Sequence, residues 1–352
     1  MGGGRPFGPP LFHSAPGASS IVFRMTNNTF SLRARVATLT AIALLVSAAA
    51  AGCSSGGAST AAAGRGGPAG LPVLDSARLI QDLTRLSHDS MAGRATGTPE
   101  NAKARAFLVS ELRRIGIPGL DGTYEYPFQS ARRNRPDSVS GVNVLGYLRG
   151  GVNPERVIVV SAHYDHVGVR NGEIFNGADD NASGTAGVLA LAAYFKANPP
   201  QHSILFALFD AEEMGLLGAR ALVASPPIPL ARIGANVNLD MVSRSDQGEL
   251  WAAGAAHYPQ LRPFLEGMIP LAPMPLRLGH DSGEGRDDWT NLSDQGAFHA
   301  VGIPVVLFSV EDHADYHKAT DDVERILPAF YYGAIRTIAG FLTRLDAALP
   351  PR

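Results

Sequence analysis

Short apolar runs alternate with stretches of helical periodicity over most of the chain. The runs are rich in branched side chains and hold few polar positions, which is typical of strands buried on both faces of a sheet. The expected strands are 122–128, 142–148, 157–160, 203–209, 235–239, 249–253 and 305–310, and the expected helices are 74–88, 98–114, 182–197 and 327–348. This alternation predicts an α/β fold with three layers, in which a mostly parallel, mixed central sheet is flanked by helices.

The first 72 residues follow another pattern. Residues 1–24 are rich in glycine and proline and show no period, which predicts an upstream extension without regular structure and translation from Met25. Residues 25–52 look like a secretory signal peptide, with Arg33 and Arg35 before an apolar run and small residues after it. The apolar run holds about 16 residues, fewer than the ~20 that a membrane-spanning helix needs.

Cys53 directly follows the small residues Ala50, Ala51 and Gly52. This arrangement resembles a bacterial lipobox, in which the cysteine is lipidated and becomes the mature N-terminus. Residues 53–72 are rich in glycine, serine and alanine and read as a flexible tether. We therefore expect export to the bacterial cell envelope with a lipid anchor at Cys53; plain secretion is the alternative. Residues 73–349 form the predicted catalytic domain, and no internal repeat or second domain is evident.

Composition excludes several classes of protein and site. The chain has 352 residues, of which 45% are hydrophobic, and its net charge is −2. A charge so close to neutral gives no electrostatic case for binding nucleic acid or an acidic membrane surface. A single cysteine excludes an internal disulfide and a cysteine-based zinc site. Ten histidines and 32 acidic residues leave ample material for a histidine and carboxylate site. Nothing in the sequence indicates an oligomeric state.

Polar side chains follow the ends of the predicted strands. Because the crossover strands of a parallel sheet run in one direction, these side chains should meet at its C-terminal edge. They are His163, Asp165 and Asp179 after the strand at 157–160, Glu212 and Glu213 after 203–209, Asp240 after 235–239, and His317 after 305–310. Histidine and carboxylate ligands suit zinc, manganese or cobalt. Two ions would explain the excess of carboxylates, because one carboxylate can bridge both.

Five short segments around these residues match, in the same order, the motifs of a known family. They are HYDH, NGADDNASG, DAEEMGLLGA, NLDM and DYHKATDD. Together they resemble the co-catalytic di-zinc aminopeptidases, the group that includes aminopeptidase Y and bacterial leucyl aminopeptidases, over about residues 74–348. The resemblance implies a zinc exopeptidase that removes N-terminal amino acids from peptides.

The resemblance also assigns roles to individual residues. It implies two Zn²⁺ ions, with Mn²⁺ or Co²⁺ as substitutes, that activate a shared water. His163 and Asp240 would bind one ion, Glu213 and His317 the other, and Asp179 would bridge them. Glu212 would be the general base, and Asp165 would orient His163. A cis peptide bond is expected between Asp179 and Asp180.

Several alternatives stay open at this stage. A carboxypeptidase, dipeptidase or deacylase of the same fold would use a similar site. A glutaminyl cyclase shares the fold with one zinc, and a non-catalytic envelope protein could bind peptides or metal on the same scaffold. His313 competes with His317 as the ligand, whereas His166 is expected to be a structural group rather than a ligand.

Overall fold

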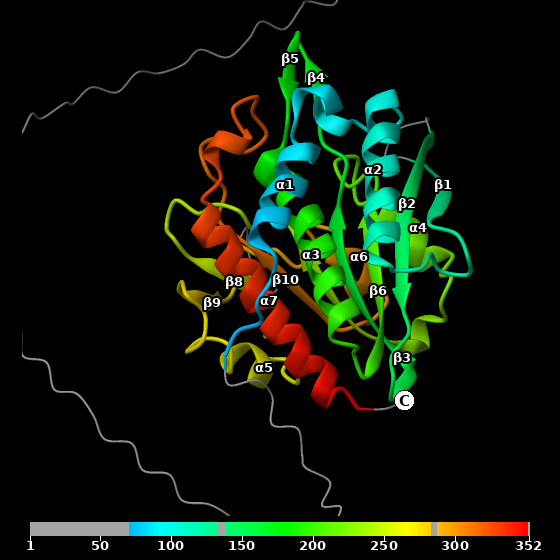
Figure 1. Cartoon of the computed structure of the whole chain (residues 1–352), viewed down its shortest axis with the longest axis vertical. Helices are drawn as coiled ribbons and strands as arrows, with labels where there is room; N and C mark the ends of the chain where they lie inside the picture. Colours follow the sequence, from blue (N-terminus) through cyan, green and yellow to red (C-terminus); the bar gives the residue numbers. More distant parts are fainter. Residues whose placement is uncertain (1–69, 132–137, 283–286, 351–352) are drawn as a thin grey trace, which may run out of the picture. The chain divides into compact units, whose positions relative to one another are not determined.

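A computed structural model of the chain describes residues 70–131, 138–282 and 287–350 (Figure 1). All of these residues belong to one compact unit. The predicted upstream extension, the signal peptide, the anchor at Cys53 and nearly all of the tether lie outside the described residues.

The described chain is built around a sheet of eight strands. In chain order these are β1 (Glu125–Ala131), β2 (Ser138–Leu148), β3 (Asn153–His163), β6 (His202–Phe209), β7 (Ile233–Leu239), β8 (Leu250–Ala253), β9 (Leu276–Leu278) and β10 (Val305–Ser309). Their order across the sheet is β1-β2-β6-β3-β7-β10-β8-β9. The central strands β6, β3, β7 and β10 are mutually parallel, whereas β1, β2 and β8 pair antiparallel. The prediction of a mostly parallel, mixed sheet is confirmed.

Helices cover both faces of this sheet. On one face lie α1 (Ser76–Leu86), α2 (Pro99–Ile115), α3 (Gly184–Ala197) and α7 (Pro328–Ala348), as Figure 1 shows, and on the other lie α4 (Leu217–Ala224) and α6 (Gln295–His299). Successive side chains of β3 point to opposite faces. Ile158 and Val160 therefore join the larger core cluster, and Val157 and Val159 join the smaller one. This two-sided burial explains the continuous apolar runs of the central strands.

Helix ends follow their local sequence signals. The side chain of Thr98 accepts a hydrogen bond from the backbone N–H of Asn101 and caps α2, and Pro99 occupies its first turn. The same helix ends at Gly116, whose φ of 83° is the left-handed conformation that glycine adopts without strain. No helix in the described ranges is both long and apolar enough to cross a membrane.

The structure adds elements that the sequence pattern did not predict. A hairpin of β4 (Gly168–Arg170) and β5 (Glu173–Phe175) lies between the expected strand at 157–160 and the expected helix at 182–197. Between the expected strands 249–253 and 305–310, where no element is expected, lie α5 (Arg262–Glu266), β9 and α6. The remaining short elements are 3-10 helices at Asp89–Arg94, Leu230–Arg232 and Val323–Arg325 and a π-helical turn at Ala178–Ser183. All are too short for periodicity to identify.

Candidate metal centre

The C-terminal ends of the central strands bring the predicted polar residues together. His163 ends β3 and pairs in register with Phe209, the last residue of β6, so the loop after β6 begins beside it. β7 ends next to β3, which places Asp240 on the other side. A cleft of about 350 Å³ opens over these ends. Its lining includes His163, Asp180, Glu212, Glu213, Asp240 and His317.

One set of ligand atoms gathers around His163. Its Nε2 atom lies 3.4 Å from Oδ1 of Asp180 and 3.3 Å from Oδ1 of Asp240. On the other side of the ring, Nδ1 lies 3.1 Å from the backbone oxygen of Asp165. A proton on Nδ1 would be donated to that oxygen, which leaves the lone pair of Nε2 facing the two carboxylates.

A second set of ligand atoms gathers around His317. Its Nε2 atom lies 3.0 Å from Oδ2 of Asp180 and 3.3 Å from Oε2 of Glu213. The other oxygen of Glu213 lies 2.7 Å from Nδ1 of His166. His166 is fully buried and does not line the cleft, whereas His317 lines it. The two histidines therefore contact different oxygens of Glu213.

The spacing of these atoms fits tetrahedral zinc. Ligands about 2.0–2.1 Å from a tetrahedrally coordinated zinc lie roughly 3.3 Å from one another. Both sets show separations of 3.0–3.4 Å between histidine nitrogen and carboxylate oxygen. The two oxygens of Asp180 belong to different sets. The spacing of histidine and carboxylate therefore suits two cations that share Asp180. A ligand atom of Glu212 also lies within 4.8 Å of ligand atoms of His163 and Asp240, and a ligand atom of His166 lies within 4.8 Å of those of Asp180 and Glu213.

The predicted bridging role of Asp179 is wrong, because its side chain does not face the cleft. Oδ1 of Asp179 accepts hydrogen bonds from the backbone N–H and the hydroxyl of Ser243, and Oδ2 lies 3.1 Å from Nε2 of His313. Its carboxylate is thus enclosed away from the cleft, and Asp180 occupies the bridging position. The cis peptide bond joins Asp180 to Asn181, one residue later than predicted. His313 likewise faces Asp179, which leaves His317 at the cleft.

Two buried groups hold the loop that carries Asp180. The carboxylate of Asp321 accepts hydrogen bonds from the backbone N–H groups of Asp179 and Asp180. The guanidinium of Arg94 is fully buried and donates to four backbone oxygens. These belong to Leu86, Tyr164, Asn176 and Gly177. Neither role leaves a local signal in the sequence, because the partners are backbone atoms distant in sequence.

Asp165 positions both His163 and the loop after β6. Its carboxylate lies 3.6 Å from Nδ1 of His163, too far for a hydrogen bond, so its contact with the ring is made by the backbone oxygen. The carboxylate instead accepts hydrogen bonds from the backbone N–H groups of Glu212 at 3.0 Å and Glu213 at 3.4 Å. One residue thus positions the histidine and the two glutamates together.

The adjacent glutamates experience opposite electrostatic environments. Burial raises the pKa of Glu212 well above its usual range, and the neighbouring carboxylates of Asp240 and Asp294 add to this effect against the opposing influence of His163. Burial acts on Glu213 in the same direction, but His166 and His317 outweigh it and lower its pKa to about 2. Paired carboxylates with separated pKa values are the pattern expected of a proton carrier beside a permanently charged ligand.

Asp294 is a buried carboxylate behind the cleft. Within the described ranges, neither of its side-chain oxygens has a hydrogen-bond partner, and burial raises its pKa to about 8. It precedes α6, and its charge acts on Glu212. Its position after a loop-rich stretch gave no signal for its burial.

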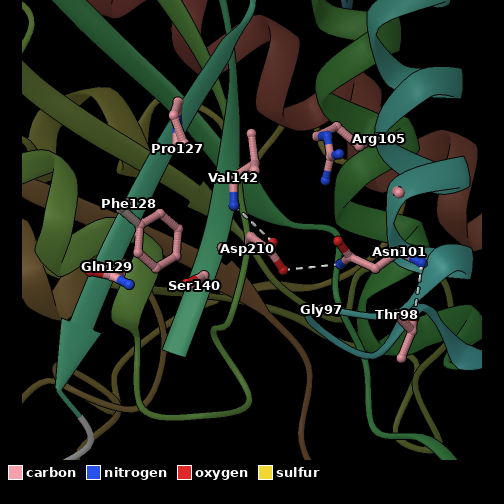
Figure 2. A pocket seen from close by; sticks show the side chains of 12 residues that line it. Gly97, Thr98, Asn101, Arg105, Pro127, Phe128, Gln129, Ser140, Val142 and Asp210 are labelled. Atoms are coloured by element: carbon pink, nitrogen blue, oxygen red, sulfur yellow. Dashed lines mark hydrogen bonds between the residues drawn. The ribbon is translucent and has the colours of Figure 1, made fainter. Parts of the chain in front are cut away.

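A second hollow lies on the other side of β6 (Figure 2). It has a volume of about 490 Å³ between α2 and the strands β1 and β2. Asp210, at the end of β6, forms part of its lining, and hydrogen bonds join it to Asn101 and Val142 in the figure. It also accepts hydrogen bonds from the hydroxyl of Thr96 and the backbone N–H of Ala211. Asp210 anchors the start of the Glu212 loop rather than facing a ligand.

The chain is similar in sequence to curated hydrolases. A probable zinc metalloprotease of Pyrenophora tritici-repentis is 34% identical over 127 residues, which cover 34% of this chain and 28% of the relative. Aminopeptidase YwaD of Bacillus subtilis is 41% identical over 197 residues, which cover 52% of this chain and 40% of the relative. The chain spans less than half the length of these curated relatives.

Solved structures share the fold at low sequence identity. BSAP, a zinc aminopeptidase from Bacillus subtilis, superposes with a TM-score of 0.61 at 19% identity and covers 78% of this chain and 96% of its own. The glutaminyl cyclase of Porphyromonas gingivalis gives a TM-score of 0.63 at 17% identity, with 77% and 98% covered. At such identities the likeness concerns the fold alone.

The sequence profile of Peptidase family M28 matches residues 143–342. This range spans more than half of the chain. It contains every residue of the two ligand sets, together with Glu212 and Asp165. The chain belongs to Peptidase family M28.

Proposed function

We propose that this chain is a zinc-dependent aminopeptidase that hydrolyses the N-terminal peptide bond of peptides. Membership of Peptidase family M28 supports peptide hydrolysis, and the names of the relatives from Pyrenophora and Bacillus support zinc and an aminopeptidase. The observation that carries the proposal is the sharing of Asp180 between two histidine and carboxylate sets, each spaced for a zinc ion.

The proposed ligands follow from the two sets. His163 and Asp240 would hold one Zn²⁺, and Glu213 and His317 would hold the other. Asp180 would serve both through its two oxygens. When bound, the ions lower the pKa of a water molecule towards neutrality and polarise the carbonyl of the substrate.

The chain's own residues supply proton transfer and orientation. Glu212 lines the cleft with a raised pKa, so its carboxylate can take a proton from the attacking water and deliver it to the leaving amine. Asp165 fixes Glu212 through the backbone N–H and His163 through Nδ1. Glu213 is adjacent to Glu212, but its two oxygens contact His166 and His317, which lower its pKa and keep it charged.

A substrate panel with metal analysis tests the proposal. Purified protein would be assayed on leucine para-nitroanilide, on its N-acetylated form and on a peptide with N-terminal glutamine, before and after chelation and with zinc restored. We expect hydrolysis of the free-amine anilide but not of its N-acetylated form, and no pyroglutamyl product from the glutamine peptide. Activity should be lost on chelation and recovered with zinc, and elemental analysis should find close to two zinc ions per chain.

The other outcomes identify the competing functions. Release of ammonia with a pyroglutamyl product would identify a glutaminyl cyclase, the activity of a structural neighbour. Cleavage of N-blocked substrates would favour a carboxypeptidase or deacylase. A single zinc per chain in fully active protein would remove the bridging role from Asp180.

We also propose export and anchoring at Cys53. Support comes from residues 25–52, which resemble a signal peptide, and from the small residues 50–52 directly before the sole cysteine, which resemble a lipobox. The tether that follows Cys53 agrees with this reading. Expression of the full chain in a bacterial host with radiolabelled palmitate tests this idea. Labelled protein in the membrane fraction, abolished by Cys53→Ala, is expected; unlabelled protein in the medium would indicate plain secretion.

A further inference from the structure

Arg220 differs from the other charged side chains that line the cleft. It lies on α4, is exposed, and is the only lysine or arginine among the described lining residues. Arginines elsewhere, such as Arg244 and Arg277, form ion pairs with carboxylates. Within the described part of the chain, no ion pair joins Arg220 to a carboxylate. Its guanidinium is therefore available to a ligand.

The position of α4 places Arg220 close in the chain to the loop that carries Glu212. The helix begins directly after the loop that carries Glu212, and the backbone N–H of Arg220 donates to the oxygen of Leu216 in that loop. α4 also packs against α6, and Asn291 and Leu292, shortly before α6, line the same cleft. Arg220 and Glu212 therefore line the same cleft, on consecutive segments of the chain.

The other charged residues that line the cleft are acidic. The lining includes four carboxylates, from Asp180, Glu212, Glu213 and Asp240. A lone arginine in a cleft this acidic favours a ligand with an anion at one end. The volume of about 350 Å³ lies at the small end of the range for ligand sites, roughly 300–1,000 Å³, and suits a short peptide better than a protein chain.

We propose that Arg220 binds the C-terminal carboxylate of short peptide substrates, so that the enzyme prefers dipeptides and tripeptides with a free C-terminus. This inference rests on the proposed aminopeptidase function and names its substrate class. In a dipeptide the carboxylate follows the scissile bond by one residue, about 3.8 Å of chain, so it stays inside the cleft. The planar guanidinium matches a carboxylate with two parallel hydrogen bonds, which an amide cannot reproduce.

The test compares substrates that differ only at the C-terminus. Wild-type protein, Arg220→Gln and Arg220→Lys would be assayed on leucyl-alanine, leucyl-alanine amide, leucyl-alanyl-alanine and leucine para-nitroanilide. Leucine suits the apolar lining of Leu216, Met241 and Leu292. Arg85→Gln, on the exposed side of α1, is the matched control.

We expect Arg220→Gln to lower kcat/KM about tenfold on both free-acid peptides, the loss typical of a hydrogen-bonded charge. The amide and the anilide should change by less than about twofold, and Arg220→Lys should fall between the two because it keeps the charge but not the paired geometry. Arg85→Gln should match wild type on all four substrates.

Two results would overturn the inference. One is an equal loss on the free acid and the amide, which would give Arg220 a role unrelated to the carboxylate. The other is unchanged kcat/KM on every substrate. Both leave wild-type cleavage of the anilide intact, so the proposed function would stand. If the wild type cleaves neither the anilide nor the amide, the proposed function fails and this inference fails with it.

Discussion

The cleft and the hollow beside Asp210 lie on opposite sides of β6, and both have acidic residues at the strand end. Their carboxylates differ in the partners they have. Asp210 accepts four hydrogen bonds from N–H and O–H donors of the protein. Asp180 faces histidine nitrogens with both side-chain oxygens, and Asp294 has no described donor at all.

This difference distinguishes a structural carboxylate from a functional one. A buried carboxylate with a full set of donors is already stabilised and needs no ligand. Several buried carboxylates in one place without such donors repel one another and require cations. The hollow is the larger of the two, at about 490 Å³ against 350 Å³, yet the smaller cleft holds the reactive groups. Volume is thus a poor guide to this site, and hydrogen-bond saturation is a better one.

The largest effect is expected from Asp180→Asn. An amide cannot present two anionic oxygens, so both ligand sets lose their shared member. We expect bound zinc to fall clearly below two per chain and turnover of leucine para-nitroanilide to fall by roughly 10⁴-fold, which corresponds to several kcal/mol of metal-dependent stabilisation. Elemental analysis and steady-state kinetics measure both quantities.

The neighbouring Asp179→Asn serves as its control. The side-chain carbonyl of asparagine can still accept the hydrogen bonds from Ser243, so turnover should stay within about tenfold of wild type. Loss of zinc from Asp179→Asn with retention in Asp180→Asn would reverse the assignment of the two residues.

Glu212→Gln should have the next largest effect. Glutamine keeps the size of the side chain but cannot carry a proton, so turnover should fall by about 10²–10⁴-fold while the zinc content is unchanged. The apparent melting temperature should not fall, because a buried charge with a raised pKa is removed. A variant with wild-type turnover would show that another group is the base.

Asp210→Asn should act on stability more than on turnover. The amide group of asparagine cannot accept all four hydrogen bonds, so buried donors such as the N–H of Val142 lose their partner. We expect a loss of about 1–3 kcal/mol in the free energy of unfolding by urea and less than a tenfold loss of turnover. The measurement belongs at pH 8, because burial raises the pKa of Asp210 to about 6 and the group must be ionised.

The exposed Asp246→Asn provides the comparison, since its ion pair with Arg244 lies at the surface and should change stability by less than about 1 kcal/mol. Equal losses in the two variants would mean that the four hydrogen bonds of Asp210 contribute nothing special.

Asp294→Asn should have the smallest effect on turnover and a distinct effect on pH dependence. The pKa of Asp294 is raised in the folded protein to about 8, so its contribution to stability is complete below about pH 4 and is lost as the pH rises through 8. In chelated wild-type protein this group makes the free energy of unfolding fall between pH 5 and pH 8, on the order of 1 kcal/mol per pH unit.

Asp294→Asn removes this titration. Urea unfolding at three pH values should therefore give a shallower decline in the variant than in the wild type. Parallel profiles would show that Asp294 is ionised throughout this range in the folded state.

Much of the fold follows from patterns in the sequence. The strands β3, β6, β7 and β10 and the helices α2, α3 and α7 were predicted to within a few residues, because each is long enough to show a period or a continuous apolar run. Parallel strands then required His163, Glu212 and Asp240 to meet at one edge. The hairpin β4–β5 was missed because three-residue strands carry no periodicity.

The choice between Asp179 and Asp180 shows where sequence reasoning ends. Both are aspartates in the same turn, and a shift of one residue redirects the side chain from the cleft to Ser243. What decides between them is a set of contacts remote in sequence, above all the carboxylate of Asp321 on the two backbone N–H groups. Such contacts leave no local pattern.

The buried guanidinium of Arg94 has a consequence for the minimal active fragment. The family match begins at residue 143, yet Arg94 holds the backbone on both flanks of the site, at Tyr164 after His163 and at Gly177 before Asp180. A truncated protein that starts at residue 143 would leave these oxygens without their donor. The residues before β2 therefore support the site, and their removal should disturb it without touching any of the proposed metal ligands.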